Sequence, residues 1–143
     1  MTGRPPLGYE YFDVEADVGV EAWAPSLAGA FAQAALGVLA LAVAPAGVTE
    51  AERREVRAQG DSTEDLLVSW INECLYVHEI EGFAVNRVEV TTLTAKLAHG
   101  LLHGETIDAN RHRLGTVVKA ATAHQLEIRV EPGLALVHLV VDV

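Results

Sequence analysis

The sequence predicts one α+β domain, in which two main helices pack on a mixed, largely antiparallel β-sheet. Its 143 residues are the usual size of a single domain. Two helical patterns of apolar residues fall before Gly82, and period-two patterns predominate after it. This separation of helices from strands is typical of the α+β class. We expect residues 1–8 to form a flexible N-terminal tail and residues 9–143 to form the domain.

Two short strands are predicted at the start of the domain. Large side chains alternate in residues 9–15, and apolar side chains alternate in residues 18–24. The Ala16-Asp17 dipeptide marks a tight junction between them.

The first helix is predicted to begin at residues 25–26, with Ser26 as its N-cap, and to end at residues 45–47. Small residues on its surface favour close packing on a sheet. The stretch 27–48 is rich in alanine and interrupted by Pro45, so it indicates a buried helix rather than a membrane span. Apolar residues recur at three- and four-residue spacings: Leu27, Phe31, Ala34, Ala35, Val38, Leu39 and Ala42.

The second helix follows a charged segment, residues 49–58, which we expect to be an edge strand protected by its charges. Ser62 and Asp65 have the spacing of a capping box. Cys74 lies on the apolar face of this helix and is expected to be a buried small hydrophobe. That face comprises Leu66, Leu67, Trp70, Ile71, Cys74, Leu75 and Tyr76.

The remainder of the chain predicts a succession of strands, with six to eight in the whole domain. Pro132-Gly133 is a turn signal between the last two. The predicted strands cover residues 83–90, 94–104, 117–123, 125–131 and 134–143.

The charge of the chain restricts its partners. With 20 acidic and 10 basic residues, the formal net charge is −10. Nucleic-acid binding relies on Lys and Arg, so RNA would be met only through a basic partner protein. Alternatively, the carboxylates serve only to keep the protein soluble. The single cysteine argues for a reducing compartment, and the N-terminus lacks the apolar core of a signal peptide. A cytoplasmic protein without a membrane segment is expected.

The motifs of several enzyme classes are absent from the sequence. It has neither a Gly-rich loop followed by Lys-Ser or Lys-Thr nor a Gly-x-Gly-x-x-Gly motif. The Cys and His spacings do not match a structural zinc site.

Two acids stand beside strongly apolar strands. Asp17 lies between the first two strands, and Asp142 follows the run 137–141. If the last strand runs beside the first ones, the two carboxylates meet, and a divalent cation such as Ca²⁺ or Mg²⁺ would relieve their repulsion. Val143 would add an oxygen from its carbonyl or terminal carboxylate. The alternative is that both acids are solvated turn residues.

A second cluster combines an acid, a base and two imidazoles. Glu105, His112, Lys119 and His124 fall within 20 residues, and Lys119 alternates with apolar neighbours. They predict a candidate functional pocket in which a His acts as a general base, as in a metal-dependent hydrolase or transferase. The alternative is a solvated sheet face with surface histidines.

Together these segments make the sequence resemble the archease family over roughly residues 9–143. Archeases typically carry a His-Thr-Ala-Asp-Ile-Gly-like segment, a Leu-Leu-x-x-Trp-Leu-Asn-Glu-Leu-Leu-Tyr signature and an Ile-Asp-Ile or Leu-Asp-Val terminus. Two departures matter: Val14-Glu15 stands where the family has His-Thr, and Ala123 stands where it has Tyr. Glu15 is a candidate extra carboxylate at the metal site. The matching segments here are residues 14–19, 26–41, 65–76, 104–105, 111–112, 118–124 and 140–143.

The resemblance implies a metal-binding accessory protein rather than an independent enzyme. Archeases are thought to promote guanylylation and multiple turnover of an RtcB-type RNA ligase in tRNA splicing and RNA repair. The family binds a divalent cation, often identified as Ca²⁺, at positions that correspond to Asp17, Asp142 and Val143; Mg²⁺ and Mn²⁺ are alternatives. A chaperone-like modulator of a tRNA methyltransferase is the other function that the resemblance suggests.

Overall fold

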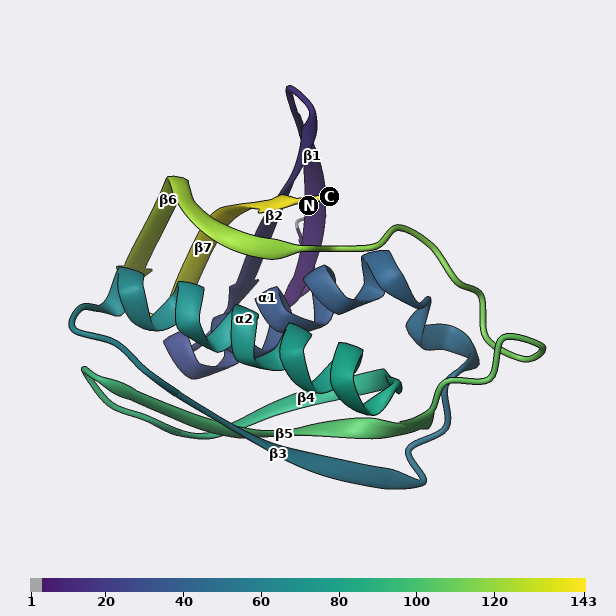
Figure 1. The fold of residues 1–143 in the computed structure, drawn as a ribbon. Coiled ribbons are helices and arrows are strands. Elements are labelled where there is room, and N and C mark those ends of the chain that lie inside the picture. The colour runs from purple at the N-terminus through teal and green to yellow at the C-terminus, as the bar shows by residue number, and fades with distance from the viewer. Residues whose placement is uncertain (1–3) are drawn as a thin grey trace.

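The computed structural model describes residues 4–143, in which two helices lie between two antiparallel sheets (Figure 1). The helices α1 (Leu27–Ala42) and α2 (Thr63–Glu81) each contact strands of both sheets. The predicted α+β class is therefore confirmed. The strands form two purely antiparallel sheets instead of one mixed sheet.

The first sheet has the strand order β1-β2-β7-β6 and joins the beginning of the chain to its end. Its central pair, β2 and β7, is antiparallel, with Val20 opposite Leu139. The predicted proximity of the first hairpin and the last strand is thus confirmed. The four strands are β1 (Gly8–Val14), β2 (Asp17–Ala24), β6 (Ala120–Glu131) and β7 (Leu134–Asp142).

The second sheet has the order β3-β5-β4. Its strand β3 (Glu52–Gln59) lies at an edge, as its charges predict. Strands β4 (Phe83–Leu93) and β5 (Leu97–Thr106) form the hairpin that completes the sheet. A single turn of 3-10 helix, η1 (Pro45–Gly47), follows α1 at the proline that was expected to stop the helix.

Both helices begin at the predicted caps. The hydroxyl of Ser26 accepts a hydrogen bond from the Gly29 N–H, and that of Ser62 accepts one from the Asp65 N–H. Each cap satisfies a backbone donor that the helix itself leaves unpaired. Helix α2 ends at Gly82, which has a left-handed φ of 57° that glycine adopts without strain.

The core lies between the sheets and around the helices. Its largest side chains are Trp70, Phe31 and Phe83, and the indole N–H of Trp70 donates to the Phe31 carbonyl. Pairing this buried donor avoids the cost of leaving it unsatisfied. Cys74 is fully buried, as its position on the apolar face of α2 predicts.

The segment before β6 differs from the sequence-based prediction. Strands were expected at residues 117–123 and 125–131, whereas the structure has one strand that begins at Ala120 and carries an irregularity between Thr122 and Glu127. Residues ahead of it lie against the end of α1: the Gly115 N–H donates to the Ala42 carbonyl, and the Thr116 N–H donates to the Leu41 carbonyl. The chain is thus held against α1 as far as Thr116 and joins β7 only from Lys119, whose N–H donates to the Asp142 carbonyl.

The predicted N-terminal tail is described only from Arg4 onward, since residues 1–3 lie outside the described part. The guanidinium of Arg4 lies over the ring of Trp23 and pairs with Glu10 and Glu21. The indole N–H of Trp23 donates to the Pro5 carbonyl. The division into a tail and a domain stays a prediction.

Within residues 4–143, neither helix is long and apolar enough to cross a membrane.

Candidate functional site

Asp17 and Asp142 occupy neighbouring positions at one end of the four-stranded sheet. Asp17 begins β2 and Asp142 ends β7. The register pairs Val18 with Val141, so one further step along both strands brings the two acids opposite each other. The same row contains Val14 of β1, opposite Asp17, and Ala120 of β6, opposite Asp142.

Both acids belong to the sheet face that points away from the helices. Val20 and Ala22 of β2 are fully buried on the helix side, and side chains alternate between faces along a strand. Asp17 therefore faces outward, and so does Asp142, because directly opposed residues share a face. Their Cβ atoms are expected to lie about 4.5–5.5 Å apart. At that spacing one cation can contact both carboxylates.

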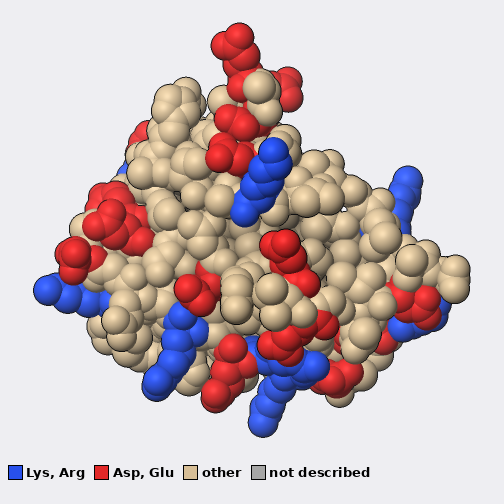
Figure 2. Space-filling model, viewed as in Figure 1, with Lys and Arg blue, Asp and Glu red and all other residues tan. Residues whose placement is uncertain are grey.

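The β1–β2 hairpin projects beyond the rest of the domain (Figure 1). It carries Asp13, Glu15 and Asp17, and acidic side chains gather on this projection (Figure 2). Glu15 lies in the turn beside Ala16, whose φ of 66° is unusual for a residue other than glycine. The tip is thus an exposed, negatively charged feature.

The donors around Asp17 and Asp142 fit an open cation site. Among residues 4–143, neither carboxylate is paired with a Lys, Arg or His. In the same part of the chain, no three His, Cys, Asp or Glu side chains are placed to hold a metal ion by themselves. Ca²⁺ takes six to eight oxygen ligands, so two carboxylates and a main-chain oxygen leave positions for water or a partner.

Lys119 and Val143 lie at the same end of the sheet. The Lys119 N–H donates to the main-chain oxygen of Asp142 over 2.8 Å, which ties the start of β6 to the end of β7. Lys119 is exposed, contrary to the expectation of a polar pocket, and Val143 is half-buried. The carbonyl of Asp142 is thus engaged, which leaves its carboxylate and the main-chain oxygen of Val143 as candidate ligands.

Glu105 and His112 form a separate cluster at the end of β5. Glu105 accepts from Arg111 Nη2 at 2.7 Å, from the Thr49 N–H at 2.8 Å and from His112 Nε2 at 2.9 Å. The hydrogen bond from Arg111, followed by those from Thr49 and His112, lowers the pKa of Glu105 to about 2. Glu105 is consequently a stable anion that holds a loop in place.

The hydrogen bonds of His112 define its tautomer. Its Nδ1 accepts the Asp108 N–H at 2.8 Å and therefore carries no proton. Nε2 is then the protonated nitrogen and donates to Glu105. His112 is 4% exposed, and both of its ring nitrogens are engaged within the protein. These bonds assign it a structural role and leave no free nitrogen for a general base.

The structure does not unite the four members of the predicted pocket. Glu105 and His112 are in contact, whereas no hydrogen bond or ion pair within residues 4–143 joins either of them to Lys119 or His124. His124 is exposed in the irregular part of β6, where its N–H donates to the Thr122 hydroxyl. Sequence spacing gave no sign of this division, and it also missed Arg111 and Thr49 as partners of Glu105.

The fold and site define a small acidic α+β protein with an open pair of carboxylates at a sheet end. The model of the archease protein family matches residues 9–143. The chain is 34% identical to the protein archease of Pyrobaculum calidifontis, with all of both chains covered. It is 35% identical to that of Saccharolobus islandicus, with 94% of this chain and 98% of the relative covered. The chain therefore belongs to the archease family.

Two solved structures share the fold. The solution structure of protein 1598 of Methanobacterium thermoautotrophicum superposes with a TM-score of 0.77 at 30% identity, covering 95% of this chain and 99% of that one. The crystal structure of an archease from Thermotoga maritima, described as a possible chaperone, gives a TM-score of 0.57 at 17% identity. The match covers 100% of this chain and 99% of that one. The second likeness supports the fold alone.

Proposed function

We propose that this archease is a cytoplasmic accessory protein that activates an RtcB-type RNA ligase through a divalent cation held by Asp17, Asp142 and Val143. The observation that carries the proposal is the register of β2 and β7, which brings two unpaired carboxylates from opposite ends of the chain into one row. Family membership supports the choice of ligase as partner. The ion, most simply Ca²⁺, would supply positive charge beside a phosphate group of the ligase site.

The residues of this chain perform two tasks in the proposal. Asp17 and Asp142 bind the ion and leave part of its coordination open, so that it can be shared with a partner. The acidic β1–β2 hairpin carries the site away from the body of the domain and favours encounter with a basic ligase surface. RNA would be contacted only through that partner.

The test measures ligase guanylylation and repeated RNA joining with the wild-type protein, Asp17→Asn and Asp142→Asn. Both variants should lose most of the stimulation. Titration calorimetry should show that they also bind calcium much more weakly than the wild-type protein. Asp61→Asn, an exposed acid in the bend before α2 and away from the β1–β2 hairpin, is the matched control and should behave as wild type. Full stimulation by both site variants would remove the metal site from the mechanism.

Binding of a tRNA methyltransferase is the competing proposal. A pull-down with the ligase and with a methyltransferase, each with the wild-type protein and Asp17→Asn, separates the two. Retention of only the methyltransferase, unaffected by the substitution, would favour the chaperone-like function. A metal-dependent hydrolase built on His112 is disfavoured by the tautomer of that residue.

A further inference from the structure

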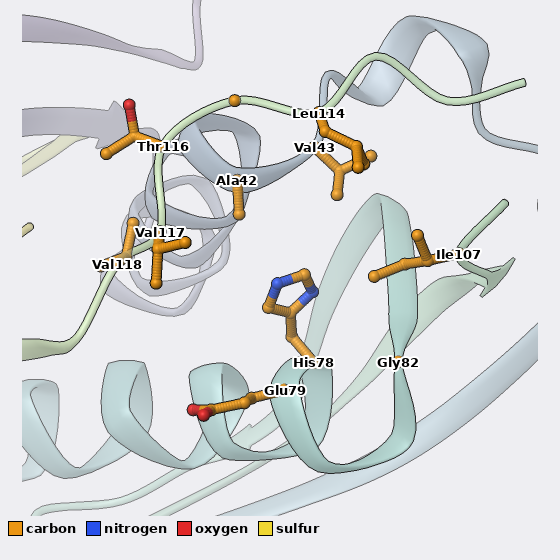
Figure 3. A pocket seen from close by; sticks show the side chains of 11 residues that line it. Ala42, Val43, His78, Glu79, Gly82, Ile107, Leu114, Thr116, Val117 and Val118 are labelled. Carbon is orange, nitrogen blue, oxygen red and sulfur yellow. The ribbon is translucent and has the colours of Figure 1, made fainter. Parts of the chain in front are cut away.

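A pocket of about 340 Å³ opens at the C-terminal ends of the two helices (Figure 3). It lies where the C-terminal ends of α1 and α2 meet the segment between β5 and β6. Its volume is in the range of small-molecule sites. The walls are mostly aliphatic and include Ala42, Val43, Ile107, Leu114, Val117 and Val118.

The outer wall of the pocket is fixed in place by backbone hydrogen bonds. Gly115 and Thr116 donate to the last turn of α1 over 2.9 Å and 2.7 Å, and the Ala44 N–H donates to the Arg113 carbonyl over 3.0 Å. A Cβ atom on Gly115 would collide with the Leu41 carbonyl oxygen, so this close approach requires glycine. The pocket is consequently formed before any ligand arrives.

His78 provides a hydrogen-bond acceptor inside this aliphatic lining. Its Nδ1 lies 2.8 Å from the Phe83 carbonyl, which can only accept, so Nδ1 carries the proton of the neutral ring. Nε2 then has a free lone pair, and within residues 4–143 no protein atom hydrogen-bonds to it. The half-buried ring extends from α2 into the pocket toward Ala42 and Val117 (Figure 3).

The charges around the pocket favour a cation. Glu79 borders it, and both helices direct their C-terminal ends, which carry partial negative charge, toward it. Among the described residues, no Lys or Arg lines it. Glu79 and the helix dipoles would disfavour an anionic ligand, whereas a protonated amine would meet an acceptor, a carboxylate and two favourable dipoles.

We propose that this pocket binds a small hydrophobic amine. The apolar body of the ligand would pack on Val43, Ile107 and Val118. Its ammonium group would donate to His78 Nε2, and Glu79 at the border of the pocket would attract its charge. Neither Asp17 nor Asp142 lines this pocket, so the proposal does not rest on the function proposed above.

The first experiment compares three probes of the same ring size: benzylamine, benzyl alcohol and benzoate, each titrated at about pH 8 into the ¹³C-methyl-labelled full-length protein. Benzylamine should shift the methyl signals of Ile107, Val117 and Val118, with a dissociation constant in the millimolar range expected of so small a ligand. Benzyl alcohol should bind several-fold more weakly, and benzoate should not bind.

Matched variants identify the groups responsible. Glu79→Gln should weaken benzylamine binding by about threefold and leave benzyl alcohol unchanged, as expected for loss of one exposed charge. Glu73→Gln, on the same helix but outside the pocket, is its control. His78→Phe should weaken the binding of both benzylamine and benzyl alcohol, because each donates a hydrogen bond to His78. His124→Phe, at an exposed position, should weaken neither. Ala42→Phe should fill the space and abolish binding.

Equal binding of the three probes would overturn the proposal, and so would the absence of shifts at the pocket methyls. If benzylamine still shifts the methyl signals in Ala42→Phe, the ligand binds outside this pocket, and the proposal is overturned as well. Glu79→Gln changes a surface residue, so the charge test does not depend on a variant that fails to fold.

Discussion

Glu105 accepts a hydrogen bond from His112 Nε2 over 2.9 Å, while the other ring nitrogen of His112 accepts one from the Asp108 N–H. This arrangement joins the end of β5 to the loop that follows it. Thr49 and Arg111 add two further donors to the same carboxylate. Glu105 thus connects three segments of the chain.

We expect Glu105→Gln to lower the stability at neutral pH, because the amide loses the charge that its three donors stabilise. The pKa of Glu105 is lowered from 4.5 to about 2, so its contribution is complete above about pH 4.5 and is lost as the pH falls toward 2. Urea unfolding at neutral and acidic pH measures this. The difference in the free energy of unfolding between wild type and Glu105→Gln should narrow as the pH falls from about 4.5 toward 2. Glu131→Gln, at an exposed position, should show no such trend.

The sequence predicted the local features of the fold because they depend on nearby residues. Ser26 and Ser62 cap the helices, and β3 is an edge strand, as expected. The division into two sheets was not predicted, since alternation shows which residues share a face but not which strands pair. The start of β6 was predicted three residues too early, because the chain just ahead of it is hydrogen-bonded to α1, a contact that no local pattern encodes.

The candidate site was predictable only in part, for the same reason. The apolar strands beside Asp17 and Asp142 indicated that the two acids need a partner, and the pairing of β2 with β7 agrees with that expectation. The state of His112 depends on Asp108 and Glu105, which approach it through a turn and a strand end. Neither residue's hydrogen-bond role follows from spacing.

Phe12 covers Gly19 on the outer face of the four-stranded sheet. A Cβ on Gly19 would overlap the Phe12 ring, which also stacks on His138 with centroids 4.1 Å apart. Gly19→Ala should therefore cost about 1–3 kcal/mol by displacing the ring. In a Phe12→Ala background the same change should cost much less. A double-mutant cycle by urea unfolding measures the coupling, and additive effects would show that the ring does not restrict this position.

Asn72 attaches helix α2 to strand β6. Its Oδ1 accepts the Ala121 N–H at 2.8 Å, and its Nδ2 lies 3.4 Å from the Ala121 carbonyl. Asn72→Ala should cost about 1–3 kcal/mol, because the half of β6 nearest the candidate metal site loses its support. Hydrogen exchange at the Ala121 amide should accelerate. The exposed Asn110→Ala is the control, and unchanged exchange in Asn72→Ala would contradict the assignment.

Arg4 secures the N-terminal segment over Trp23. Because Arg4 and Glu10 are exposed and Glu21 is only partly buried, Arg4→Ala should cost only about 0.5–1 kcal/mol of stability, and the effect should diminish at high salt. Trp23 fluorescence should shift to the red if the segment lifts away from the indole. Arg113→Ala, at an exposed loop position, should cause no shift. A spectrum insensitive to Arg4→Ala would mean that Pro5 alone holds the segment.

The central pairing of β2 with β7 also determines when the protein can become active during its synthesis. The first hairpin leaves the ribosome well before its partner strand β7, because both helices and strands β3 to β6 lie between them in the chain. Such long-range pairing must wait for the intervening chain. The row of Asp17 and Asp142 can therefore assemble only after β7 has been made, so a nascent chain that still lacks β7 would not have the complete ligand pair.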